Sequence, residues 1–216
     1  MPDAPPTHPP KSSREEVEHT IAEHMLGILE ALGCEVSSPG MSDTPQRVAR
    51  MLVRETCHGL FTPSPILTTF PRVEGERGPV HVTGIAVRSL CEHHLLPMEG
   101  WATVSYLPDS EVLGLSKLNR LVHWWASRPQ LQERLTLQIQ QSLMDHLRLP
   151  SVAVSLCLRH ACVVHRGVCD DQSMTWTHQL AGEFAEGDRW LREAHFHACR
   201  LEPALQRQEE ATLLPL

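Results

Sequence analysis

The chain has 216 residues, of which 41% are hydrophobic, and a formal net charge of −7. This length suits one sizeable domain with its own core, and an acidic chain without a polybasic run argues against nucleic acid as a partner. No apolar run approaches the ~20 residues that cross a bilayer, which argues against a membrane partner. The seven cysteines are odd in number and irregularly spaced, and no apolar signal segment opens the chain. We therefore expect a reduced, cytoplasmic protein whose thiols are core residues or metal ligands.

The N-terminal region is expected to hold a disordered arm followed by two helices. Residues 1–12 are rich in proline and poor in apolar anchors, which is typical of disorder. Ser13 and Glu16 have the spacing of a capping box, so the first helix begins there. Thr44 is a good N-cap and Pro45 suits the first helical position, so a second helix follows and runs to about residue 59.

The middle of the chain begins with a predicted hairpin. After a Pro-rich loop over residues 62–71, residues 80–91 have the β-branched content of a strand, with Gly84 as a bulge. Residues 101–107 alternate as a second strand, and the segment 96–100 between the two predicts a hairpin turn.

Helices and a second strand pair are expected to complete the fold. Ser116 is the expected N-cap of a helix that ends before Pro129, and another helix runs from about residue 130 to 147. The segments that follow are strand-like over 151–158, 161–168 and 174–178, before a last helix over about 185–199. Hairpins favour antiparallel sheets, so the predicted fold class is α+β.

Two short segments place thiols beside imidazoles: Cys91-Glu92-His93-His94 and His160-Ala161-Cys162. They offer two Cys and three His, whereas a structural zinc site takes four protein ligands and a catalytic one takes three plus a water. Two spare acid/base groups beside an activated water favour a hydrolytic metal centre. Residues two apart in a strand share a face, so His160 and Cys162 are expected to face one cleft. The same rule pairs Cys91 with His93, whereas a bend would pair Cys91 with His94, so spacing alone leaves the histidine ligand open.

A closed structural zinc site is the main alternative to a catalytic one. It needs a fourth protein ligand, which His93 or His160 could supply. A DNA-binding zinc module is disfavoured by the acidic charge and by the lack of paired Cys-x-x-Cys motifs.

A helix start near residue 116 is a candidate phosphate site. Ser116, Lys117 and Arg120 place a hydroxyl and two cations at a helix N-terminus, whose free N–H groups attract anions. The alternative is an ordinary capped helix with solvated cations. Glu133, in the first turn of the next helix, has a carboxylate that either favours the helix dipole or accepts two adjacent N–H groups of a purine edge. Arg166 is a further cation that could face the same cleft.

Taken in order, these segments resemble the GTP cyclohydrolase I family, which catalyses the first step of pterin and folate synthesis. The matching segments are Thr44-Pro45-Gln46-Arg47-Val48-Ala49, Cys91-Glu92-His93-His94, Gly114-Leu115-Ser116-Lys117, Arg128-Pro129-Gln130-Leu131-Gln132-Glu133-Arg134-Leu135-Thr136, His160-Ala161-Cys162, Arg166-Gly167 and Ser173-Met174-Thr175-Trp176-Thr177. They span about residues 14–200, and their combination is far more specific than any single segment.

The resemblance implies a tunnelling fold, in which ββαα-type units assemble into a barrel, and a ring-shaped homodecamer with active sites between subunits. The chain would then comprise the arm (1–12), an N-terminal helical segment (13–60), a catalytic tunnelling-fold domain (61–200) and a C-terminal tail (201–216). The implied reaction is zinc-dependent hydrolysis of GTP at C8, with ring opening, formate release and rearrangement to 7,8-dihydroneopterin triphosphate. Its partners would be GTP, water and further copies of the chain.

The resemblance also implies a role for each candidate residue. Zinc would be bound by Cys91, His94 and Cys162. The acid/base pair would be His93 and His160, and the guanine edge would be held by Glu133 and Gln132. The triphosphate and ribose would be faced by Ser116, Lys117, Arg120 and Arg166, with Arg47 and Arg50 reaching in from a neighbouring subunit.

Some residues depart from the family's pattern. Arg50 stands where the family often has lysine, which keeps the charge but changes its geometry, and Met98, Trp101 and Trp176 are bulkier than usual. These departures leave open a paralogue that acts in a specialised pterin or deazapurine pathway. A non-catalytic, zinc-stabilised nucleotide-binding oligomer is the other alternative.

Overall fold

The computed structural model describes residues 10, 12–76, 78–147, 150–187 and 189–212, with backbone only for 146–147 and 201–212. The helices are α1 (Arg14–Ala31), α2 (Thr44–Met51), η1 (Leu52–Thr56), η2 (His58–Leu60), α3 (Leu115–Ala126), α4 (Gln132–Leu147), α5 (Ala161–Val164), η3 (Gly182–Phe184) and α6 (Arg189–Thr212). The strands are β1 (Thr69–Pro71), β2 (Val80–Cys91), β3 (Pro97–Tyr106), β4 (Glu111–Leu113), β5 (Pro129–Gln130), β6 (Val152–His160) and β7 (Thr175–Leu180).

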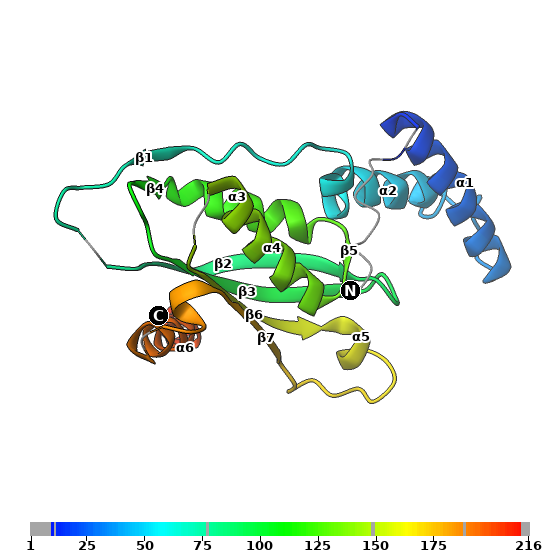
Figure 1. Ribbon diagram of the computed structural model, residues 1–216. Helices are drawn as coiled ribbons and strands as arrows, with labels where there is room; N and C mark the ends of the chain where they lie inside the picture. Colours follow the sequence, from blue (N-terminus) through cyan, green and yellow to red (C-terminus); the bar gives the residue numbers. More distant parts are fainter. Residues whose placement is uncertain (1–9, 11, 77, 148–149, 188, 213–216) are drawn as a thin grey trace.

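A five-stranded sheet in the order β5-β2-β3-β6-β7 forms the centre of the molecule (Figure 1). Its four long strands pair antiparallel, and only the short β5 runs parallel to β2. Helices α3 and α4 cover one face of the sheet and α6 lies against the other. The expected α+β class is confirmed, and β2, β3, α3 and α4 follow in this order as a ββαα unit, with only the short β4 and β5 between them.

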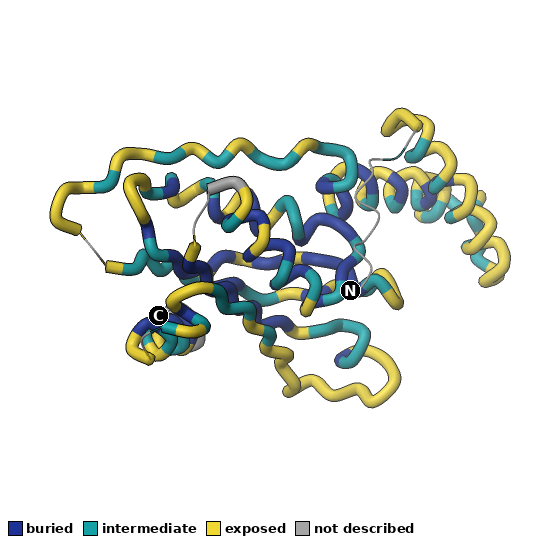
Figure 2. The backbone as a smooth tube through the Cα atoms, viewed as in Figure 1, coloured by how far each residue is buried: buried dark blue, intermediate teal, exposed yellow. Residues whose placement is uncertain are grey.

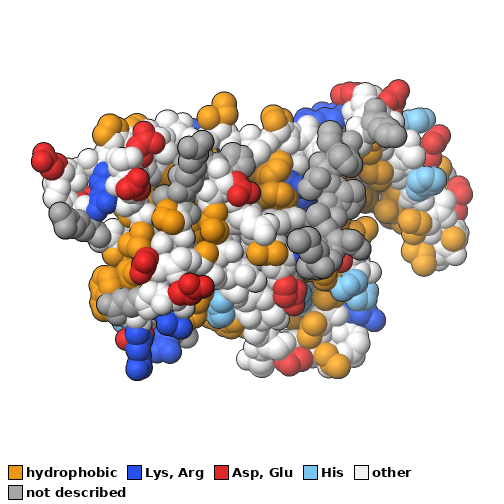
Figure 3. Space-filling model, in the orientation of Figure 1, with side chains coloured by type: hydrophobic (Ala, Val, Ile, Leu, Met, Phe, Trp, Pro, Cys, Tyr) orange, Lys and Arg blue, Asp and Glu red, His pale blue; other side chains and the backbone are white. Residues whose placement is uncertain are grey.

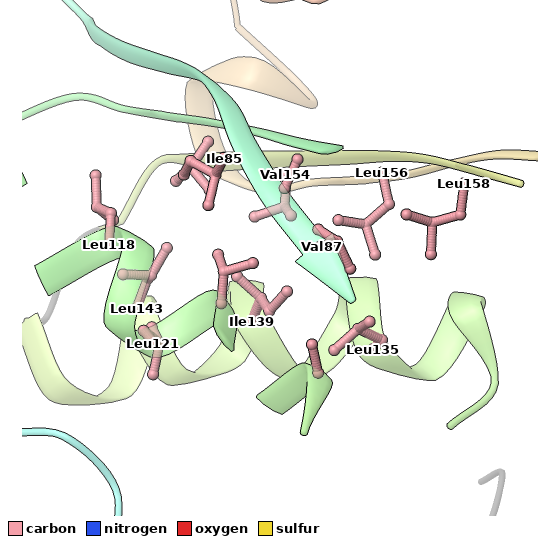
Figure 4. Close-up of a cluster of buried hydrophobic side chains, with 14 of the residues drawn as sticks. Ile85, Val87, Leu118, Leu121, Leu135, Ile139, Leu143, Val154, Leu156 and Leu158 are labelled. Carbon is pink, nitrogen blue, oxygen red and sulfur yellow. The ribbon is translucent and has the colours of Figure 1, made fainter. Parts of the chain in front are cut away.

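The main core lies between the sheet and the α3–α4 layer (Figure 4). It includes Ile85, Val87, Leu118, Leu121, Leu135, Ile139, Leu143, Val154, Leu156 and Leu158, each at most 1% exposed. Burying an aliphatic side chain of this size contributes about 1.5–3 kcal/mol, so this layer is the main source of stability. Figure 2 shows the same division, with the sheet buried and both α1 and the loop after α5 largely exposed.

The N-terminal helices agree with the sequence in their starts. The capping box is present, because the Glu16 N–H donates to Ser13 Oγ and the Ser13 N–H donates to a Glu16 carboxylate oxygen. Helix α2 starts at Thr44 and continues through a π-helical turn, η1, and a 3-10 turn, η2. The expected arm lies outside the described residues, apart from residues 10 and 12.

Several boundaries differ from those expected. The N-cap of α3 is Gly114 and not Ser116. Strand β3 begins at Pro97, so the hairpin turn is shorter than expected, while the bulge at Gly84 is confirmed by a register shift between Val82 and Ile85. The short pairing of β1 with β4 was not expected. The last helix begins later than expected, and its backbone continues to Thr212 in what was expected to be a tail.

The predicted strand over 161–168 is wrong. Strand β6 ends at His160, whose partner in β3 is Met98, and the next residue of β3 is Pro97, which has no N–H to donate. The chain therefore leaves the sheet and forms the helical turn α5. Strand β6 pairs instead with β7, from Leu158 opposite Thr175 onward.

No helix within the described residues combines the length and the apolarity needed to span a bilayer.

Candidate metal centre

The turn between β2 and β3 positions one half of a thiol–imidazole cluster. Cys91 donates its N–H to the Leu96 carbonyl (2.8 Å), and its own carbonyl accepts the N–H of Leu95 (2.8 Å) and of His94 (3.3 Å). Leu95 adopts the left-handed conformation (φ 53°), which closes the turn tightly. Cys91 Sγ consequently lies 3.9 Å from His93 Nδ1 and 4.0 Å from His94 Nδ1.

The helical turn α5 supplies the other half. Because His160 pairs with Met98 at the start of β3, the end of β6 lies beside the β2–β3 turn, and α5 places Cys162 there. Ligand atoms of Cys91, His94 and Cys162 all lie within 4.8 Å of one another. The expectation that His160 and Cys162 share a strand face is wrong, since a helical turn and not a strand joins them.

The chemistry of this donor set suits zinc. Two thiols and an imidazole are typical zinc ligands, and zinc bonds of about 2.0–2.3 Å bring ligand atoms to separations of this order. Burial raises the pKa of the Cys162 thiol, and the adjacent Cys91 thiol raises it further. Its thiolate therefore forms most readily when a cation binds beside it. Cys91 is buried and His94 exposed, so the cluster opens to solvent on one side.

Arg166 contacts the cluster through His94. Its Nη1 donates to His94 Nε2 at 2.9 Å, and both side chains are exposed. An arginine can only donate, so in this arrangement Nε2 of His94 carries no proton.

His160 lies at the end of β6 and bonds to α4. Its Nε2 is 2.7 Å from Oε1 of Gln132, which is only 2% exposed. Burial lowers the pKa of His160, and the nearby carboxylate of Glu133 acts in the opposite direction. His160 is therefore a partly buried imidazole whose neutral form is favoured, with a carboxylate close by.

The structure also reveals an ion pair that the sequence analysis did not single out. Arg134 Nη2 donates to a Glu92 carboxylate oxygen, and its Nε donates to Gln130 Oε1 at 3.4 Å. The Glu92 N–H donates to the Gln130 carbonyl at 3.1 Å, so β5 and α4 hold the cysteine-bearing turn in place. Both charged residues lie inside segments that the sequence already singled out. They are 42 residues apart in the chain, however, so their pairing could not be predicted.

The structure brings some predicted site residues together and separates others. Near the cluster lie Cys91, His93, His94, Gln132, Glu133, His160, Cys162 and Arg166. Ser116, Lys117 and Arg120 are in the first turns of α3, whose other end leads into β5 beside Cys91. A 12-residue helix is about 18 Å long, so Ser116 and Lys117 lie at the end of α3 that is far from the cluster, and Arg120 lies near its middle (Figure 1).

The two arginines of α2 also lie away from the cluster. Arg47 forms an exposed ion pair with Asp43 (3.3 Å), and the charge of the exposed Arg50 acts on Glu18 of α1. Neither contact joins α2 to the thiol–imidazole cluster within one chain. The assignment of these arginines and of the α3 residues to one substrate site stays a prediction.

The family model and the curated relatives that match this chain belong to one family. A family model described as GTP cyclohydrolase I matches residues 21–200. GTP cyclohydrolase 1 of Shewanella amazonensis is 42% identical over 173 residues, which cover 80% of each chain. GTP cyclohydrolase 1 of Shewanella denitrificans is 40% identical over 196 residues, covering 88% of this chain and 90% of the relative. A solved structure of apo archaeosine synthase QueF-Like has a TM-score of 0.39 at 16% identity, covering 50% of this chain and 96% of that chain.

Proposed function

The chain belongs to the GTP cyclohydrolase I family, and on this premise we propose that it hydrolyses GTP at C8 and converts it to 7,8-dihydroneopterin triphosphate with release of formate. One observation carries the proposal: Cys91, His94 and Cys162 form a metal-binding group with two further imidazoles, His93 and His160, nearby. A purely structural zinc site would not need these additional acid/base groups.

We assign the metal to zinc, held by Cys91, His94 and Cys162. When bound, zinc lowers the pKa of a coordinated water to about 7 and so makes a nucleophile available at neutral pH. A metal ion on either ring nitrogen of His94 would break the hydrogen bond from Arg166. An ion on Nε2 would occupy the acceptor, and an ion on Nδ1 would leave the ring proton on Nε2, which then could not accept from the arginine. Arg166 is then free to face an anionic substrate.

His93 and His160 are proposed as the acid/base pair. Water adds at C8 of the guanine, and opening of the imidazole ring requires a proton on the departing nitrogen. A second water then releases C8 as formate, and the remaining ribose and amine rearrange and close to the pterin with loss of one water. A positioned acid or base typically contributes about 10²–10⁴-fold to such steps.

Glu133 is the proposed acceptor for the guanine edge. It is exposed in the first turn of α4 and close enough to His160 for its charge to act on that imidazole. Gln132 was expected to share this role, but its side-chain amide is buried and bonds to His160 and to the protein backbone. A direct contact of Gln132 with the base stays a prediction.

Phosphate recognition is proposed for a site shared between subunits. Ser116, Lys117 and Arg120 would contact the triphosphate, together with Arg166 and with Arg47 and Arg50 of α2. Ser116 and Lys117 lie at the end of α3 that is far from the cluster of their own chain, which supports a shared site, because a second copy could supply them. Exposed apolar residues at the C-terminal end of α1 also support assembly: Ile28 is 51% exposed and the C-cap Leu32 is 73% exposed, and hydrophobic side chains gather over this helix in Figure 3. We propose a homo-oligomer, most simply the family's decamer.

The function is tested by incubating the purified protein with GTP, with and without a zinc chelator. Formate and, after oxidation, fluorescent neopterin are measured. We expect both products from the zinc-loaded protein and neither after chelation. Zinc-loaded protein that binds GTP but releases no formate would instead be a non-catalytic nucleotide-binding oligomer.

A further inference from the structure

A buried hydrogen-bond network on α4 and β7 fixes the orientation of the Gln132 amide. Its Nε2 lies 2.8 Å from the Thr175 carbonyl and 3.3 Å from the Leu156 carbonyl. Backbone carbonyls only accept, so this end of the amide must be the NH₂ group. The opposite end, Oε1, therefore faces His160 Nε2 at 2.7 Å.

Two threonines complete the network with a single direction of donation. Thr136 Oγ1 donates its one hydrogen to the backbone carbonyl of Gln132 at 2.8 Å. The hydroxyls of Thr136 and Thr177 are 2.6 Å apart, so Thr177 must be the donor in that bond. The oxygen of Thr177 keeps its lone pairs and accepts from Gln132 Nε2 at 3.1 Å. Thr136 is 0% and Gln132 2% exposed, so water does not compete for these bonds.

We propose that Thr136 and Thr177 are positioning residues for His160, which act through Gln132. An amide oxygen can only accept, so Nε2 of His160 carries a proton in both the neutral and the charged ring. Proton exchange by His160 is thereby confined to Nδ1. The inference rests on the proposed function, in which His160 transfers protons during turnover.

Loss of either hydroxyl relaxes this control. Without the Thr177 oxygen, the Gln132 NH₂ group keeps its two carbonyl acceptors but loses the third, so rotation of the amide is opposed less strongly. A rotated amide presents N–H to His160 Nε2, which must then lose its proton in favour of Nδ1. The ring would hold its proton on the wrong nitrogen for the reaction, an error that is costly in other enzymes that use an oriented imidazole.

The test compares isosteric valine variants with serine variants that keep the hydroxyl. Thr136→Val and Thr177→Val are expected to lower kcat by about tenfold or more, within the range that a positioned acid or base contributes, with little change in the KM for GTP and full zinc content. Thr136→Ser and Thr177→Ser should restore most of kcat. Thr20→Val is the matched control, because Thr20 on α1 also donates to the carbonyl four residues earlier, at 2.9 Å, and lies far from β7 (Figure 1).

A second comparison separates positioning from general stability. In a His160→Ala background, Thr177→Val should have no further effect on the residual rate, since its action passes through the missing ring. Equal fold-losses in both backgrounds, or unchanged kcat in both valine variants, would overturn the inference. Wild-type protein that releases no formate would instead contradict the proposed function itself. The two threonines are tested separately, so a folding failure at one position leaves the other decisive.

Discussion

A hydrogen bond between Arg166 and His94 joins the candidate metal site to the proposed substrate site. The bond from Arg166 Nη1 to His94 Nε2 is 2.9 Å long and needs an unprotonated nitrogen. A metal ion on His94 removes that acceptor, so ion binding frees a cation at the mouth of the cluster. On the proposed assignment, zinc bound to His94 would therefore leave Arg166 available for an anionic substrate.

The variant Arg166→Ala tests this connection. We expect it to keep zinc at least as well as the wild type, because the arginine competes for His94. Its KM for GTP should rise by about tenfold or more, since a charge-assisted contact to phosphate or ribose is lost. Arg159→Ala, an exposed arginine on β6, is the control. Loss of zinc from Arg166→Ala would mean that the arginine supports the metal site.

A second residue-scale prediction separates metal ligands from proton-transfer groups. Cys91→Ser and Cys162→Ser should lose zinc and activity together. His93→Ala and His160→Ala should keep zinc and lose at least about 10²-fold in turnover. Zinc content and formate release are measured on the same samples. Metal-free protein from either histidine variant would contradict the assigned roles.

At the scale of elements, some features depend only on nearby residues, whereas the turn α5 depends on a distant strand. The capping box at Ser13, the strand over Val80–Cys91 and the bulge at Gly84 depend on nearby residues, and the sequence predicts them correctly. The turn α5 depends on where a distant strand ends, because Pro97 leaves β6 without a partner beyond His160. Its valines suggested a strand that long-range pairing does not allow.

The docking of α6 depends on a chain of hydrogen bonds that the sequence did not indicate. His195 is 0% exposed and lies between Ser105 and Ser155, at 2.7 Å from each hydroxyl. Those hydroxyls contact His81 and His178 in turn, each at 2.6 Å. Burial, together with the nearby His81 and His178, lowers the pKa of His195 to about 4.

This arrangement predicts lower stability in acid. In the unfolded chain a histidine binds a proton below about pH 6.5, whereas folded His195 stays neutral until about pH 4, so stability falls as the pH drops through this window. At about pH 5 the expected loss relative to pH 8 is about 2 kcal/mol from this residue alone. Urea unfolding at fixed protein concentration measures it. His195→Gln should flatten the pH dependence, while His24→Gln on α1 should not; equal slopes for wild type and His195→Gln would contradict the account.

At the scale of the whole molecule, the candidate residues form two groups that lie apart from each other. The thiol–imidazole cluster lies at the β5 end of the sheet, and Ser116 and Lys117 lie at the opposite end of α3. The sequence identifies both groups by their residue types, yet nothing local shows that one chain holds them apart. A site complete in chemistry but divided in space supports assembly from more than one copy.

Subunit mixing tests this division. Cys91→Ser, which lacks the metal site, and Lys117→Ala, which lacks a phosphate contact, are each expected to be nearly inactive. When they are unfolded together and reassembled in equal amounts, random mixing gives about one quarter of the sites both intact halves, so activity should return to about that fraction. Mixtures no more active than their parents would place both groups in the same subunit's site.

The most direct test of the central claim is a zinc titration of metal-free protein supplied with GTP labelled at C8. We predict that labelled formate appears in proportion to added zinc and stops increasing at one zinc per chain, and that Cys162→Ser releases none across the titration. Labelled formate from metal-free protein, or none at one zinc per chain, would contradict hydrolysis at a metal centre formed by Cys91, His94 and Cys162.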